Sequence, residues 1–183
     1  MGRKKQTNIE LEENNTVIEE HKEFNIVVPL YKEELDEADK LSISRLFNIT
    51  ENKYPVYFIC DINYNADNIK DFLLKECDLS FEKYDYYIKR IKGNYFESKY
   101  TYSKMLLSDW FYKEWLAFGF DYTYIYQTDC YLFRDELQHF VDLGYDYIGA
   151  PILATNSDWG TTGGYVGNGG FSLRNNRKFM DVL

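Results

Sequence analysis

The sequence predicts an α/β fold in which a mainly parallel sheet carries helices on both faces. Two observations predict this class. Short runs of β-branched and aromatic residues alternate with longer segments whose apolar residues recur at helical intervals. Such alternation is typical of strand–helix–strand units, whose strands run parallel beneath covering helices. A length of 183 residues fits a single domain.

The first 22 residues are polar and acidic, and we interpret them as a leader or linker before a domain that covers residues 23–183. The basic start, Arg3 to Lys5, is followed by polar residues instead of the apolar core of a signal peptide. No apolar run approaches the ~18 residues that span a bilayer, so we expect no transmembrane segment. Membrane association, where it occurs, is expected through a partner.

Charge and cysteine content exclude two classes of site. The net charge of −9 argues against nucleic-acid binding, which needs a basic face to replace counterions. Cys60, Cys77 and Cys130 lack the close spacing of zinc ligands. We therefore expect free thiols in a reducing compartment, and a cytoplasmic protein.

The first half of the domain predicts five elements in order. Phe24–Leu30 is a β-branched run of a buried strand, and Tyr31–Phe47 is a helix with acidic residues in its first turns. Tyr54–Asp61 is a second apolar strand that ends in an acid. A helix over Asp67–Glu76 and a third strand over Tyr84–Ile91 follow.

The second half continues the alternation. Apolar residues over Ser98–Phe118 predict the longest helix, which Gly119 ends. Tyr122–Gln127 is a strand, a helix begins near Arg134, and Asp146–Pro151 is a further strand.

Two features follow the last of these strands. The Gly-, Thr-, Asn- and Ser-rich segment Thr155–Gly164 is a candidate lid or an ordinary surface connection. Asn176–Leu183 reads as the start of a helix and ends abruptly. We therefore expect the domain to be incomplete at its C-terminus.

Residues at the carboxyl ends of the strands are the candidate binding residues, because open α/β sheets bind ligands there. This rule nominates Leu30, Tyr31, Asp61 and Asp129. A divalent cation, Mn²⁺ or Mg²⁺, could take oxygen ligands from Asp129, a diphosphate and water. Asp129 could instead cap a turn or pair with Arg134.

Four segments, in this order, resemble the metal-dependent glycosyltransferases of the GT-A fold, which carry an Asp-x-Asp motif. Thr101–Leu107 is similar to the helix before the motif, and Ile125–Phe133 to the motif strand. Tyr147–Pro151 is similar to the next strand. Gly167–Arg174 is similar to the Gly-rich segment that lines the donor-sugar pocket. The chain also resembles a bacterial domain family of unassigned function that is found beside surface-polysaccharide transferases.

The resemblance implies a glycosyltransferase that moves a sugar from a UDP- or GDP-sugar donor to a glycan acceptor in bacterial surface-polysaccharide assembly. It implies that Lys104 reaches the motif and the diphosphate, although a surface lysine is the plainer interpretation. It implies that Asn168, Gly169 and Gly170 line the sugar pocket, although Asn-Gly also predicts a β-turn.

The motif departs from the family pattern in one respect: only Asp129 is acidic, since Thr128, Cys130 and Tyr131 offer no second carboxylate. The missing carboxylate therefore weakens the prediction of metal dependence more than the prediction of donor binding. In the resembled fold the acceptor-facing acid lies further along, which implies a catalytic base beyond Leu183.

Two alternatives to the glycosyltransferase remain. A non-catalytic or decayed nucleotide-sugar-binding module would keep the fold without turnover, in keeping with the single acid and the early end. A nucleotidyltransferase would need a Gly-rich phosphate loop after the first strand, and Pro29 to Glu33 contains no glycine.

Overall fold

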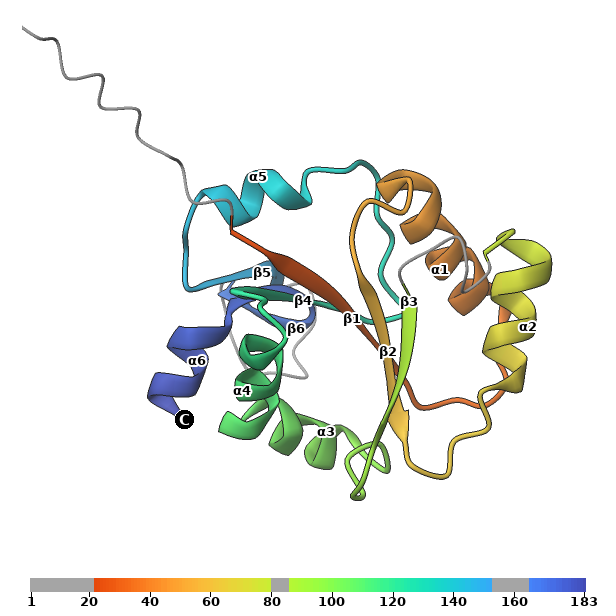
Figure 1. Ribbon diagram of the computed structural model, residues 1–183, viewed down its shortest axis with the longest axis horizontal. Helices are drawn as coiled ribbons and strands as arrows, with labels where there is room; N and C mark the ends of the chain where they lie inside the picture. Colours follow the sequence, from red (N-terminus) through yellow and green to blue (C-terminus); the bar gives the residue numbers. More distant parts are fainter. Residues whose placement is uncertain (1–21, 80–85, 153–164) are drawn as a thin grey trace, which may run out of the picture.

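The computed structural model describes residues 22–79, 86–152 and 165–183 (Figure 1). The proposed leader, apart from Lys22, and the candidate lid Thr155–Gly164 lie outside these residues. The division at residue 23 therefore stays a prediction. In the described part of the chain, no helix is both long and apolar enough to cross a bilayer.

Six strands form one sheet in the order β3-β2-β1-β4-β6-β5. Strands β1 to β4 pair in parallel, and β6 is antiparallel to both β4 and β5. The mainly parallel sheet is thus confirmed. The strands are β1 (Phe24–Leu30), β2 (Val56–Asp61), β3 (Tyr86–Ile91), β4 (Tyr122–Tyr126), β5 (Tyr147–Ile152) and β6 (Tyr165–Asn175).

Helices cover both faces of the sheet, as predicted (Figure 1). Helices α1, α2 and α5 pack on one face, and α3, α4 and α6 lie on the other. The helices are α1 (Glu37–Thr50), α2 (Asp67–Glu76), α3 (Lys99–Leu106), α4 (Asp109–Ala117), α5 (Leu137–Asp142) and α6 (Asn176–Val182).

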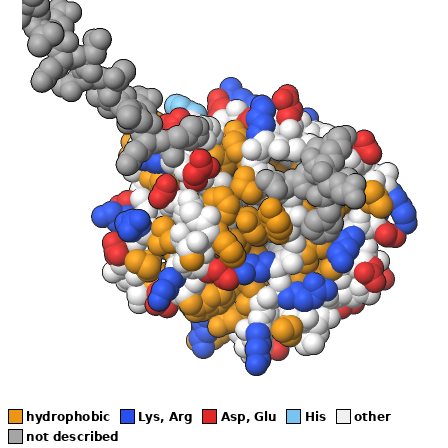
Figure 2. All heavy atoms as spheres, viewed as in Figure 1, with side chains coloured by type: hydrophobic (Ala, Val, Ile, Leu, Met, Phe, Trp, Pro, Cys, Tyr) orange, Lys and Arg blue, Asp and Glu red, His pale blue; other side chains and the backbone are white. Residues whose placement is uncertain are grey.

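The central strand β1 is buried along its whole length because it has a hydrophobic cluster on each side. Ile26 and Val28 pack with α1 and α2, whereas Val27 packs with α3 and α4. This is the alternation of side chains along a strand. On the face seen in Figure 2, apolar side chains gather over the middle and charged side chains lie mostly around the rim.

The expectation of one long helix over Ser98–Phe118 is wrong, since the segment forms α3 and α4 with a break at residues 107–108. Ser108 has an extended backbone, and its hydroxyl donates to the Lys104 carbonyl at 2.6 Å. The Tyr112 hydroxyl donates to the Leu106 carbonyl at 2.7 Å. These hydroxyls donate to backbone carbonyls that would accept backbone N–H groups in a continuous helix. The break therefore adds little to the free energy of the folded chain. Among the described residues the longest helix is α1, with 14 residues.

Two helix starts also lie later than expected. The first helix begins at Glu37 instead of Tyr31, because Asp36 caps it and forms a capping box with Asp39. The helix expected near Arg134 begins at Leu137. Both shifts lengthen the connections that follow β1 and β4, where the candidate site lies.

Candidate functional site

A cavity of about 310 Å³ opens beyond the carboxyl ends of β1 and β4. Pro29 and Tyr31 line it from β1 and the connection after it, and Gln127 lines it from the end of β4. Residues 96–99 and Tyr102 complete the wall from the start of α3. The cavity therefore lies where open α/β sheets bind ligands.

The N-terminus of α3 forms one side of this cavity. Ser98 is the N-cap, and its side chain accepts a hydrogen bond from the Thr101 backbone N–H in a capping box. Lys99, the first residue of α3, also lines the cavity. Free N–H groups in a first helical turn favour negatively charged groups nearby.

Tyr102 and Gln127 are lining residues that the sequence did not nominate. The Tyr102 hydroxyl is buried, and no described atom meets hydrogen-bond geometry with it. Burial raises its pKa to about 12, while the nearby Gln127 side chain and the charge of Arg174 act in the opposite direction. Tyr102 therefore keeps its proton at neutral pH and has a hydrogen-bond donor to offer a ligand.

Asp129 follows β4 in a turn closed by a hydrogen bond of 2.9 Å from the Cys130 N–H to the Gln127 carbonyl. Its side chain is exposed and makes no ion pair within the described residues. Arg134, a candidate partner by sequence, pairs with Glu136 instead, at 3.1 Å from Nε to Oε2. The Cys130 thiol donates a long hydrogen bond of 3.8 Å to Asp129 Oδ1, which leaves the exposed carboxylate able to meet a ligand.

The Gly-rich residues of β6 lie directly beside this turn. Gln127 N–H donates to the Gly170 carbonyl at 2.8 Å, and the Cys130 thiol lies 3.4 Å from the same oxygen. The Asn168 side-chain oxygen accepts from the Gly170 N–H at 2.8 Å. Residues 168–170 belong to a strand and not to a β-turn, which removes the turn interpretation. The structure thus places Gly170, with Asn168 hydrogen-bonded to it, next to the turn that contains Asp129.

Arg174 is a buried, positively charged side chain close to Gly169, and the sequence did not nominate it either. Arg174 is 6% exposed and has no carboxylate partner among the described residues. Its Nη1 donates to the Tyr112 hydroxyl at 2.7 Å, and its guanidinium lies 5.4 Å from the Phe179 ring centroid. A Cβ on Gly169 would lie 3.3 Å from Arg174 Nη2. The glycine therefore leaves room for this charge next to the site.

Of the nominated residues, Tyr31 alone lines the cavity, Asp129 and residues 168–170 follow or adjoin Gln127, and the other three make separate contacts. Leu30 is 2% exposed and packs in the core. Asp61 ends β2, where its Oδ1 accepts from the Asn63 N–H at 2.8 Å. Lys104 is exposed on α3, with Nζ 4.9 Å from the ring centroid of Tyr100. These side chains do not contact Asp129 in the structure.

The side chains around Asp129 could hold a divalent cation only together with oxygen atoms of a bound ligand. No group of three or more His, Cys, Asp or Glu side chains gathers at one point within residues 22–79, 86–152 and 165–183. The pKa of Cys130 is raised to about 12, chiefly by burial and then by the Asp129 charge, so it stays a thiol and is a poor ligand. Asp129 is the remaining oxygen ligand, and a diphosphate would have to supply others.

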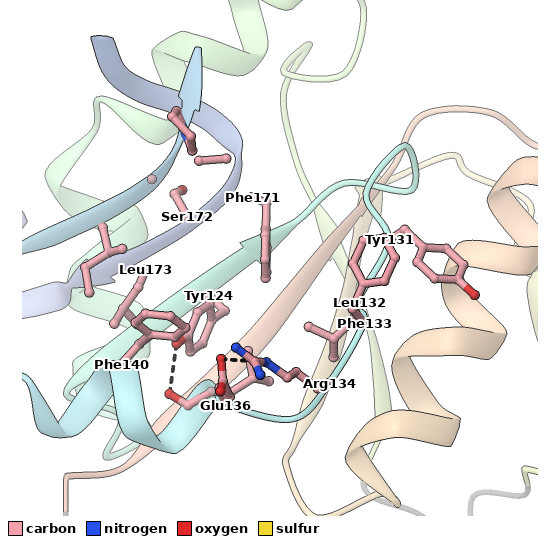
Figure 3. A pocket seen from close by; sticks show the side chains of 15 residues that line it. Tyr124, Tyr131, Leu132, Phe133, Arg134, Glu136, Phe140, Phe171, Ser172 and Leu173 are labelled. Carbon is pink, nitrogen blue, oxygen red and sulfur yellow. Dashed lines mark hydrogen bonds and ion pairs between the residues drawn. The ribbon is translucent and has the colours of Figure 1, made fainter. Parts of the chain in front are cut away.

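A second cavity, of about 410 Å³, lies on the face of the sheet that carries α5 (Figure 3). Its wall is largely aromatic and aliphatic, and Phe171, Tyr124 and Phe140 contribute rings to it. The ion pair between Arg134 and Glu136 lies in the same view. With few polar groups, this cavity offers little that could bind a phosphate.

Comparison with solved structures identifies a similar fold. Core-mannan synthase A from Aspergillus fumigatus, in its Mn/GDP form, matches with a TM-score of 0.56 and 11% identity, over 98% of this chain and 67% of that one. The mannosyltransferase Ktr4p from S. cerevisiae, in complex with GDP, has a TM-score of 0.47 and 10% identity, over 88% and 60% of the two chains. At 11% identity the likeness to core-mannan synthase A shows the fold alone, and it confirms the expected class.

No curated protein matches the sequence. One family model does, and it covers residues 85–183, more than half of the chain. That model is described as a protein of unknown function, DUF5672. The chain therefore belongs to the DUF5672 family.

Proposed function

We propose that the chain binds a nucleotide-sugar donor, a UDP- or GDP-sugar, and acts as a glycosyltransferase. The observation that carries this proposal is the cavity beyond β1 and β4, whose lining residue Gln127 lies in the same turn as the exposed Asp129. The fold, similar to that of a synthase in a Mn/GDP form, supports it.

The cavity wall offers what each part of a nucleotide needs. The Tyr31 ring is 55% exposed at the cavity and can cover a base or ribose. The first turn of α3, with Lys99, favours the negative charge of a diphosphate. Tyr102 and Gln127 add polar groups deeper in the wall.

The remaining nominated residues take roles that follow from their places. Asn168, Gly169 and Gly170 lie next to Gln127, so we assign them to the sugar end of the donor. Asp61 is assigned to the ribose or base by its place at the end of β2. Lys104 would reach the diphosphate only by leaving the Tyr100 ring.

Asp129 would hold a divalent cation, Mn²⁺ or Mg²⁺, together with the donor phosphates. Such a cation would supply positive charge to the diphosphate as it leaves. With a single carboxylate from the chain, metal affinity should depend strongly on the bound nucleotide.

The acceptor we propose is a glycan in bacterial surface-polysaccharide assembly, on the resemblance in sequence alone. The second candidate function is a nucleotide-sugar-binding module without turnover. The lone acid at the diphosphate end favours it, because the resembled enzymes use two.

Calorimetry with UDP- and GDP-sugars, with and without MnCl₂, tests the donor site. The matched variants are Asp129→Asn and Asp71→Asn, because Asp71 is an exposed acid on α2 whose partner is Lys75. We expect binding that manganese strengthens, that Asp129→Asn weakens and that Asp71→Asn leaves unchanged. A folded chain that binds none of these donors would refute the proposal. Donor binding without sugar transfer or donor hydrolysis would favour the second candidate.

A further inference from the structure

One face of α1 holds the segment that carries Asp129. Asp39, Ser42 and Arg45 are spaced by three residues and therefore project from the same side of the helix. We call these three residues the α1 clamp. Figure 1 shows the chain after β4 running beside α1 before it reaches α5.

The clamp makes a series of hydrogen bonds along this segment. Thr128 Oγ1 donates to Asp39 Oδ1 at 2.5 Å, and Ser42 Oγ donates to the Cys130 carbonyl at 2.6 Å. Arg45 donates to the carbonyls of Leu132 and Phe133 at 2.9 and 3.0 Å. Asp129 therefore lies between two residues that α1 fixes.

Asp39 also joins this segment to the connection after β1. Its carboxylate is 3% exposed, and its Oδ2 accepts from Lys32 Nζ and from the Asp36 N–H, both at 3.0 Å. The hydrogen bonds that Lys32 donates to Asp36 and then to Asp39 raise the pKa of Lys32 above its ordinary value. Lys32 follows Tyr31 and Thr128 follows Gln127, so one buried carboxylate connects the two segments that contribute these lining residues to the cavity.

We propose that Asp39 is a positioning residue of the donor site, which acts through Thr128 to hold Asp129 towards the metal and the diphosphate. This inference rests on the proposed function. An exposed aspartate loses rotational and backbone freedom when it binds a ligand. Because Thr128 and Cys130 are already held by α1, less conformational entropy is left to lose when Asp129 binds. The groups that orient a metal ligand commonly decide its affinity in this way.

The competing explanation is that the clamp only stabilises the fold. In that case the loss of the Thr128 hydroxyl would lower thermal stability without changing ligand affinity. A positioning role predicts a selective loss: binding of the diphosphate with manganese should weaken, and binding of the nucleoside alone should not.

The test compares Thr128→Val, Thr128→Ser and a matched control, Thr50→Val. Thr50 is a buried threonine at the other end of α1, where its hydroxyl donates to the Leu46 carbonyl at 2.8 Å. The ligands are GDP and UDP with MnCl₂, and guanosine and uridine, titrated by calorimetry. We expect Thr128→Val to weaken diphosphate binding roughly 10-fold, the lower end of losses for residues that orient metal ligands. Thr128→Ser should restore it, and Thr50→Val should not change it.

A double-mutant cycle with Asp129→Ala separates positioning from general damage. If Thr128 acts through Asp129, then Thr128→Val should have no further effect once the carboxylate is gone. An equal loss in both backgrounds, or an equal loss for nucleoside and diphosphate, would overturn the inference. A wild type that binds no diphosphate removes the proposed function and this inference together. A wild type that binds, with an unaltered Thr128→Val variant, removes this inference alone.

Discussion

Gly170→Ala should weaken donor binding by moving the side chain of Gln127. A Cβ on Gly170 would lie 2.6 Å from Gln127 Oε1, closer than real Cβ atoms approach an oxygen, and 3.2 Å from Asn168 Oδ1. The backbone of Gly170 is not left-handed, so alanine can adopt it and the close contact is the whole effect. Because the clash is with the end of a flexible side chain, Gln127 should move and the strand should stay.

The size of the effect follows from the group displaced. One hydrogen bond between Gln127 and the donor contributes about 0.5–1.5 kcal/mol. Its loss corresponds to a roughly 2- to 12-fold weaker affinity. The overpacking itself should lower the free energy of unfolding by about 1 kcal/mol, the small end of such costs.

Calorimetry with GDP or UDP and MnCl₂ measures the affinity, and urea unfolding measures the stability. Gln127→Ala should produce a similar loss of affinity, and adding Gly170→Ala to it should produce little more. The reasoning is refuted if Gly170→Ala binds as the wild type does, or if its effect is undiminished without the Gln127 side chain.

Three further predictions concern stability and reactivity. Tyr112→Phe should lower the free energy of unfolding by about 1–3 kcal/mol, because the buried Arg174 Nη1 loses its hydrogen-bond acceptor, and urea unfolding no different from wild type would contradict this. Lys32 lowers the pKa of Asp36 to about 2, so this pair stabilises the fold above about pH 4 and loses its effect as pH falls towards 2. Lys32→Met should therefore make the free energy of unfolding depend less on pH between about pH 4 and pH 2. Burial raises the pKa of Cys130 to about 12, so iodoacetamide at pH 8 should alkylate it far more slowly than a free cysteine; labelling at the rate of a free thiol would count against this burial.

Five strands of the described sheet were predictable from the sequence because buried strands carry an unbroken apolar signal, whereas β6 was expected only as a Gly-rich segment. Phe24–Leu30 forms β1 with the bounds expected, and Asp67–Glu76 forms α2 with the bounds expected. In both segments, the spacing of apolar residues and the flanking turn residues favour the same element that packing in the folded protein favours. Local and global preferences then specify the same element.

The break between α3 and α4 was missed because apolar periodicity continues across it. Leu107, Phe111 and Trp115 repeat every four residues, which is helical spacing, although the helix breaks at residues 107–108. What ends α3 is a hydrogen bond from the Ser108 hydroxyl and another from Tyr112, which no periodicity reports. Ser108 followed by Asp109 was the local signal of a new helix start.

The site was predictable only at the ends of strands. Tyr31 and Asp129 were nominated from their places after β1 and β4, and the Gly-rich segment from its resemblance to a family; their part in donor binding stays a prediction. Tyr102, Gln127 and Arg174 were missed, because an apolar helix position, a strand end and a strand interior look like ordinary structure in sequence. Their roles depend on which groups stay unpartnered after folding.

Hydrogen exchange with and without nucleotide tests the central claim most directly, because it locates the ligand as well as detecting it. With GDP or UDP and MnCl₂ present, we predict slower exchange at residues 96–102 and 127–130, which surround the cavity beyond β1 and β4. Exchange at residues 132–137 and 148–151, around the cavity of Figure 3, should not change. Protection confined to that second cavity, or none at saturating nucleotide, would contradict the assignment of the donor site.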